Sequence, residues 1–133
     1  MVAVLGTASG AGAETLPLET GYYVQSDTPC QRGSNATLTR YDGLSFGQAR
    51  TECRKLVIRK LAEGSYQVTK RCRDVQGRGG PWETVRSSFA IRSRTEFVET
   101  TQFGTVSFRY CSQSDLPDPW NTIDLRSARR QPS

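Results

Sequence analysis

The stretch TECRKLVIRKLAEGSYQVTKRCRDV, residues 51–75, decides the fold expected for this chain. Each half is rich in β-branched and aromatic residues, and the two halves are separated by the sequence AEGS at residues 62–65. Such segments around a glycine-containing turn are typical of a β-hairpin. We therefore predict two long antiparallel strands here, and the rest of the chain is interpreted around them.

The two cysteines of this stretch suggest how the strands pair. If opposed residue numbers sum to 125, Cys53 lies opposite Cys72 and Val57 lies opposite Val68, so a cross-strand disulfide and an apolar pair share one face. Ile58 then points to the other face. The pattern therefore leaves open either a strand with two partly buried faces or a register that differs by one.

A helix competes with the strand over residues 45–61. Ser45 followed by Gln48 fits a capping box, apolar residues then recur at near-helical spacing, and Gly64 could end the helix. The strand is preferred because residues 56–58 form a continuous apolar run and residues 65–73 have no helical spacing. The helical alternative stays open at this point.

Further strands are expected on both sides of the hairpin. Residues 82–91 alternate, with Glu83, Val85, Ser87, Phe89 and Ile91 on one side, and this side is expected to face a core towards the C-terminal end of the strand. Residues 97–101 and 105–111 give the clearest hairpin signal, around QFG at 102–104. Short strands with Gly, Pro and Asp turns predict an all-β fold, a small antiparallel barrel or sandwich of six to eight strands.

The length of 133 residues fits one domain with a modest core. Residues 1–13 are small, apolar and uncharged and end in a small-x-small pattern, which predicts a truncated signal peptide; a small-residue leader is the alternative. Residues 14–120 form the predicted domain, in which Trp120 closes against the core. Residues 121–133 are expected to be a flexible basic tail. No apolar run is long enough to span a membrane.

Four cysteines are present, and they are interpreted as two disulfides. They lie far apart in sequence and the chain contains no histidine, which argues against a zinc site. Three connectivities are possible. The hairpin register favours Cys53 with Cys72, which leaves Cys30 with Cys111. Disulfides and the leader together predict a periplasmic or secreted protein.

The absence of histidine excludes histidine triads, histidine metal sites and histidine proton shuttles from this chain. Carboxylate pairs could form only if the fold brings them together, and surface carboxylates on strands and turns are mostly solvated. We expect no enzymatic activity, no catalytic residue, no metal and no cofactor.

Positive charge is the strongest functional signal in the sequence. Residues 50–73 contain eight cations and two carboxylates, a balance of plus six that exceeds the +5 of the whole chain. On a two-stranded ribbon they would form a basic stripe able to attract a polyanion. The candidate binding residues are Arg54, Lys55, Arg59, Lys60, Lys70, Arg71 and Arg73. Alternatively, the same charges only blunt a sheet edge and maintain solubility.

An exported location favours an anionic envelope component as the partner, namely lipopolysaccharide, anionic lipid or an acidic glycan. Nucleic acid is disfavoured because aromatic residues are not interleaved with the cations. A second hypothesis is a protein-binding module, such as an inhibitor of a secreted hydrolase that inserts the loop of residues 76–81 into a partner's cleft.

Besides the leader and the disulfide-linked β pattern, the chain contains five short segments that bear on its family: GYYV at 21–24, DTPC at 27–30, SNATL at 34–38, YC at 110–111 and LPDPW at 116–120. In these features the chain resembles a group of small exported proteobacterial β proteins with disulfides, a group defined by pattern and not by activity. It is more loosely similar to the periplasmic lysozyme and protease inhibitors of Gram-negative bacteria. No inhibitory motif of those families matches here, so the resemblance assigns no site residue.

Overall fold

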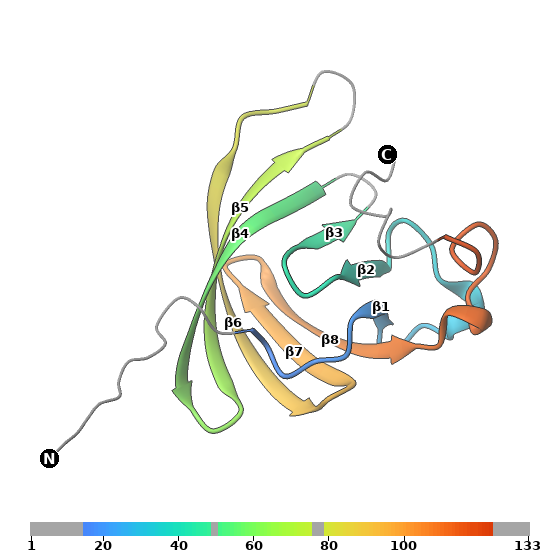
Figure 1. Ribbon diagram of the computed structural model, residues 1–133, viewed down its shortest axis with the longest axis horizontal. Helices are drawn as coiled ribbons and strands as arrows, with labels where there is room; N and C mark the ends of the chain where they lie inside the picture. The colour runs from blue at the N-terminus through green and yellow to red at the C-terminus, as the bar shows by residue number, and fades with distance from the viewer. Residues whose placement is uncertain (1–14, 49–50, 76–78, 124–133) are drawn as a thin grey trace, which may run out of the picture.

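A computed structural model describes residues 15–48, 51–75 and 79–123. Eight antiparallel strands follow one another around a closed barrel, and β8 pairs with β1 to complete it (Figure 1). The strands are β1 Gly21–Gln25, β2 Leu38–Tyr41, β3 Phe46–Gln48, β4 Thr51–Ala62, β5 Ser65–Asp74, β6 Glu83–Ser93, β7 Glu96–Thr101 and β8 Gly104–Cys111. Two 3-10 turns, η2 Cys30–Arg32 and η3 Gln113–Asp115, complete the described elements. The predicted all-β class is confirmed. Of the two predicted architectures, a barrel or a sandwich, the structure is a barrel.

The predicted central hairpin is present as β4 and β5, and the helical alternative for residues 45–61 is wrong. Cys53 lies opposite Cys72, as the register predicted, but Val68 faces Ile58 and not Val57. The register shifts by one residue after Arg54, where Lys55 has φ 54°, a left-handed conformation. A bulge of this kind adds one residue to a strand and reverses which side chains face inward. It therefore lets both Cys53 and Ile58 be buried.

Both predicted disulfides form. Cys53 is bonded to Cys72 across β4 and β5, and Cys30 is bonded to Cys111, which ties the segment after β1 to the end of β8. The two bonds close loops of very different sequence separation, 19 and 81 residues. Disulfides form and persist in oxidising compartments, so this pairing fits a protein outside the cytoplasm.

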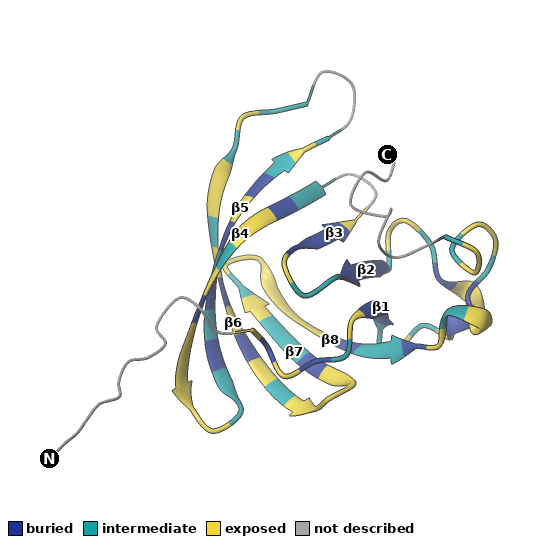
Figure 2. Cartoon of the chain, viewed as in Figure 1, coloured by how far each residue is buried: buried dark blue, intermediate teal, exposed yellow. Residues whose placement is uncertain are grey.

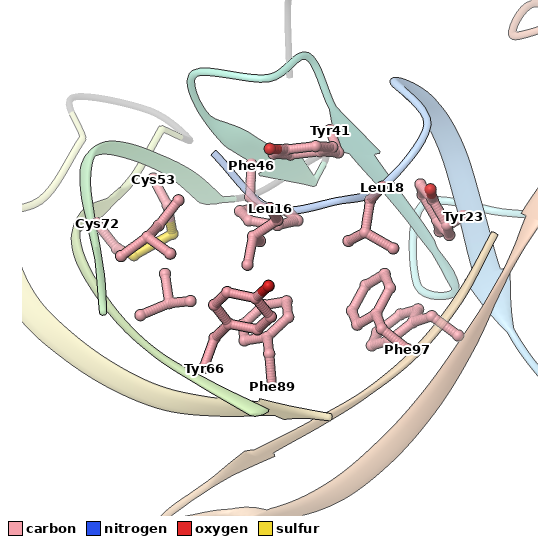
Figure 3. Packing of buried hydrophobic residues seen from close by; sticks show 13 residues of the cluster. Leu16, Leu18, Tyr23, Tyr41, Phe46, Cys53, Tyr66, Cys72, Phe89 and Phe97 are labelled. Carbon is pink, nitrogen blue, oxygen red and sulfur yellow. A yellow bond between two sulfur atoms is a disulfide. The ribbon is translucent and has the colours of Figure 1, made fainter. Parts of the chain in front are cut away.

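Aromatic residues from most of the strands fill the barrel. Along β5 buried residues alternate with more exposed ones (Figure 2). The ring of Phe97 lies 5.1 Å from that of Phe89 and 5.0 Å from that of Phe108, measured between centroids. Leu16 and Leu18, which precede β1, also lie inside the barrel (Figure 3). An eight-stranded barrel is narrow enough for side chains to fill most of its interior.

A second, smaller apolar cluster lies on the outer side of β1 and β2. It contains Tyr22, Val24, Leu38 and the Cys30–Cys111 disulfide, and Leu116 covers it. Trp120 packs against this cluster from the segment after η3, so it closes against the domain as expected, although not at the barrel interior. The predicted leader at residues 1–13 and most of the predicted tail lie outside the described residues.

The predicted strand at residues 82–91 and the predicted hairpin after it are also present, as β6, β7 and β8. Ser87 and Phe89 are buried, Val85 and Ile91 pack against the core, and Glu83 at the start of the strand is exposed. The expectation that this side faces the core towards the C-terminal end of the strand is confirmed. The first half of β8, including Val106, is exposed near the turn between β7 and β8. β6 thus places its outward residues beside those of β5, on the face that carries the candidate site.

Candidate functional site

The outer surface of β4, β5 and β6 carries a cluster of four arginines, Arg54, Arg71, Arg73 and Arg86, which we call the basic face. Arg54 and Arg71 lie directly opposite each other on β4 and β5. Arg86 lies on β6 opposite Thr69, two residues along β5 from Arg71. Like charges opposite each other on one face of a sheet destabilise it. The fold therefore concentrates positive charge here at a cost.

A tryptophan holds two of these arginines. The guanidinium carbons of Arg54 and Arg73 lie 5.3 and 5.0 Å from the centre of the Trp82 ring. Cations at this distance from an indole ring are attracted to its negative face. Local sequence did not predict an aromatic residue among these cations, because Trp82 enters from the connection between β5 and β6. Only the return of the chain to the outer side of β4 brings it there.

Few carboxylates neutralise the basic face. Glu52 forms an ion pair with Arg54 at 2.8 Å, and the exposed fraction of the Arg54 side chain is 55%. Arg71 donates a hydrogen bond from Nη1 to Thr84 Oγ1 at 3.1 Å, a neutral partner. Among the described ion pairs, Glu52 is the one carboxylate that reaches this cluster. Positive potential therefore remains at the surface.

Three other predicted binding residues lie further along β4, towards the hairpin turn. Lys55 is exposed at the bulge. Arg59 Nη2 donates to Gln67 Oε1 at 2.9 Å, and Lys60 Nζ lies 3.3 Å from Glu63 Oε1. In the described residues this part of β4 pairs only with β5, because β3 reaches β4 only at residues 51–53. Their charges thus sit where they also protect an edge from pairing with another chain.

Lys70 is not part of the basic face, and this prediction is corrected. Its exposed fraction is 7%, and its ammonium group lies inside the barrel, 2.6 Å from Glu99 Oε2. The reason is strand parity, because Lys70 shares the inward side of β5 with Val68 and Cys72. That spacing of two residues was visible in the sequence and could have identified Lys70 as an interior residue. Arg86, which the sequence analysis missed, takes its place outside.

The loop proposed for the inhibitor hypothesis, residues 76–81, follows β5. Residues 76–78 lie outside the described residues. Beyond them, Gly80 donates a backbone hydrogen bond to the carbonyl of Asp74 at 2.9 Å, which holds the end of the loop against β5.

No family model, no curated protein and no solved structure matches this chain. In the described part of the chain, none of the helical segments is long and apolar enough to cross a membrane. The fold and the surface therefore define the class directly: a disulfide-bonded, eight-stranded antiparallel barrel with an arginine-rich outer face.

Proposed function

We propose that this protein is a non-catalytic, exported binding protein whose basic face takes an anionic envelope component, such as lipopolysaccharide, anionic lipid or an acidic glycan. The observation that carries the proposal is the placement of Arg54 directly opposite Arg71 on the outer surface of the barrel. Like charges opposite each other on one face of a sheet disfavour folding, and in the described ion pairs Glu52 offsets this at Arg54 but not at Arg71. A phosphate, sulfate or carboxylate between the two guanidinium groups would turn that repulsion into attraction.

Arginine suits this task because its planar guanidinium group can donate two parallel hydrogen bonds to one anion. The basic face offers several such groups on neighbouring strands. Trp82 supports the arrangement, since its ring contacts with Arg54 and Arg73 restrict both side chains before any ligand binds. Restricting side chains in advance lowers the entropy that binding must remove.

Binding of the full chain to heparin, to lipopolysaccharide and to anionic lipid vesicles, each over a salt series, tests the proposal. We expect affinity for at least one of them to fall steeply with salt, because the interaction releases counterions. Arg71→Glu and Arg86→Glu should each weaken it by roughly tenfold or more, consistent with the loss of one charged contact.

Arg32→Glu is the matched control. It makes the same change in net charge on η2, which lies at the other end of the long axis from β4 and β5 (Figure 1). If Arg32→Glu weakens binding as much as Arg71→Glu, only the overall charge matters and the basic face is not a site. Salt-insensitive binding to a protein partner would instead favour the inhibitor hypothesis. Identifying the first residue of the mature protein tests its export.

A further inference from the structure

The two ends of the barrel differ, because the segment before β1 fills one end and the other end is open. The segment before β1 lies at the turn between β6 and β7, where the backbone N–H of Glu19 donates to the carbonyl of Arg94 at 2.8 Å. At the opposite ends of β6 and β7 a cavity of about 300 Å³ opens between strands. Its lining includes Phe46, Gln48, Lys70, Val85, Glu99 and Thr101, and Phe103 stands at its rim.

The floor of this cavity holds the Lys70–Glu99 ion pair, in which one of the two carboxylate oxygens of Glu99 accepts hydrogen bonds. Glu99 Oε2 accepts hydrogen bonds from Lys70 Nζ at 2.6 Å and from Ser87 Oγ at 2.7 Å. The Lys70 ammonium group also lies 5.2 Å from the ring of Phe46 and 5.5 Å from that of Phe89. The pair is neutral as a whole, and both groups that contact Oε2 are donors. The second carboxylate oxygen, Oε1, takes part in no hydrogen bond within the described part of the chain.

The walls combine apolar surface with a few polar atoms. Gln48 donates a side-chain amide N–H to Thr39 Oγ1 at 2.9 Å. Its side-chain carbonyl oxygen is a further hydrogen-bond acceptor beside the cavity. Val85 supplies apolar surface inside, and Phe103, at the turn between β7 and β8, has an exposed fraction of 88%. A large aromatic side chain this exposed, beside an apolar opening, is a common feature of binding sites.

We propose that this end of the barrel binds a small, uncharged aromatic or alicyclic molecule that carries an O–H or N–H group, and that Glu99 Oε1 accepts its hydrogen bond. The volume fits the lower end of the range for small-molecule sites. A charged ligand is disfavoured because Lys70 and Glu99 already neutralise each other, so a further buried charge would lack a partner. This site is separate from the basic face and does not depend on it.

N-Phenyl-1-naphthylamine is a suitable probe, since it is an uncharged aromatic amine with one N–H. Its fluorescence with the full chain should rise to saturation at one molecule per chain. Thr101→Trp should weaken binding at least tenfold by filling the opening, whereas Thr100→Trp should leave it unchanged, because Thr100 lies outside on the same strand. Equal effects of the two variants, or no saturable signal, would overturn the proposal.

Two further measurements keep the test decisive if Thr101→Trp does not fold. Phe103→Ala removes an exposed side chain and should weaken probe binding severalfold while leaving the thermal unfolding midpoint unchanged. The N-methylated probe lacks the N–H group and should bind at least tenfold more weakly to the unmodified chain. Undiminished binding of that analogue would rule out hydrogen bonding to Glu99 as the basis of recognition.

Discussion

Lys70 and Glu99 belong to strands that are not neighbours, and their side chains meet inside the barrel at 2.6 Å. Lys70 comes from β5 and Glu99 from β7, while Ser87 of the intervening β6 donates to the same carboxylate oxygen. The three residues thus link three consecutive strands through polar contacts. This link forms the base of the open end, so it affects both the stability of the barrel and the proposed small-molecule site.

Removing one partner of this pair should destabilise the protein. Glu99→Gln leaves the Lys70 ammonium group in the interior without its counter-charge, and we expect a loss of about 2 to 4 kcal/mol in the free energy of unfolding. The double substitution Lys70→Met with Glu99→Leu should recover most of that loss, because neither charge then remains. Chemical denaturation measures both. Glu96→Gln, an exposed position on the same strand, is the control and should have almost no effect.

The aromatic cluster should carry much of the stability of the barrel. Phe97→Ala removes a ring that contacts Tyr23, Phe89 and Phe108, and the resulting cavity should cost about 3 to 5 kcal/mol. Phe103→Ala, which deletes the same side chain from an exposed turn, should change stability by less than about 0.5 kcal/mol. Denaturant unfolding distinguishes them, and similar losses would contradict the assigned packing.

The bulge in β4 predicts an unusual response to substitution. Lys55 is the one described residue other than glycine with a positive φ, so Lys55→Gly should stabilise the protein by about 0.5 kcal/mol. Lys55→Val should destabilise it by roughly 1 to 2 kcal/mol, because a β-branched side chain is strained in that conformation.

Arg59 gives the control for the bulge, because it lies in the same strand in ordinary extended conformation. There the order should reverse, with glycine less stable than valine. If thermal unfolding shows valine to be more stable than glycine at both positions, the backbone at Lys55 is not strained.

The two disulfides should contribute unequally. Replacing Cys30 and Cys111 with alanine opens a link across 81 residues, and the chain-entropy treatment gives a loss of about 4.5 kcal/mol. Replacing Cys53 and Cys72 opens one across 19 residues and should cost about 3 kcal/mol. Unfolding of the two double variants, after thiol assay confirms the remaining disulfide, tests the order. A larger loss for the Cys53–Cys72 variant would mean that packing inside the barrel outweighs the length of the loop.

Alkaline pH should unfold the protein through its buried tyrosines. Burial raises the pKa values of Tyr22, Tyr23 and Tyr41 above their ordinary value of 10.0, and the negative charge of Glu19 adds to the effect at Tyr23. The unfolded chain then loses these protons first, so their contribution to stability is complete below about pH 10 and falls as the pH rises above it. Phenolate absorbance of the folded and the denaturant-unfolded chain measures the difference. Identical titration of all five tyrosines in both states would contradict it.

The sequence by itself determined the all-β class, the β4–β5 hairpin and the pairing of Cys53 with Cys72. These features depend on local composition, on alternation along a strand and on a turn between two adjacent segments, all of which are contained in short stretches. Most of the outer cations were identified for the same reason, since charge can be read directly from residue type. Alternation along the strand could not reveal the bulge at Lys55, where the two-residue period of inward and outward side chains is interrupted.

Only the tertiary structure decided which charges act together. Arg86 joins Arg71 because β6 pairs with β5 in one particular register, and Trp82 reaches Arg54 because the chain returns to the outer surface after β5. Lys70 meets Glu99 across an intervening strand, and the open end exists only because eight strands close into a barrel. These contacts join segments far apart in sequence, so their geometry follows from strand register and barrel closure and not from any local pattern.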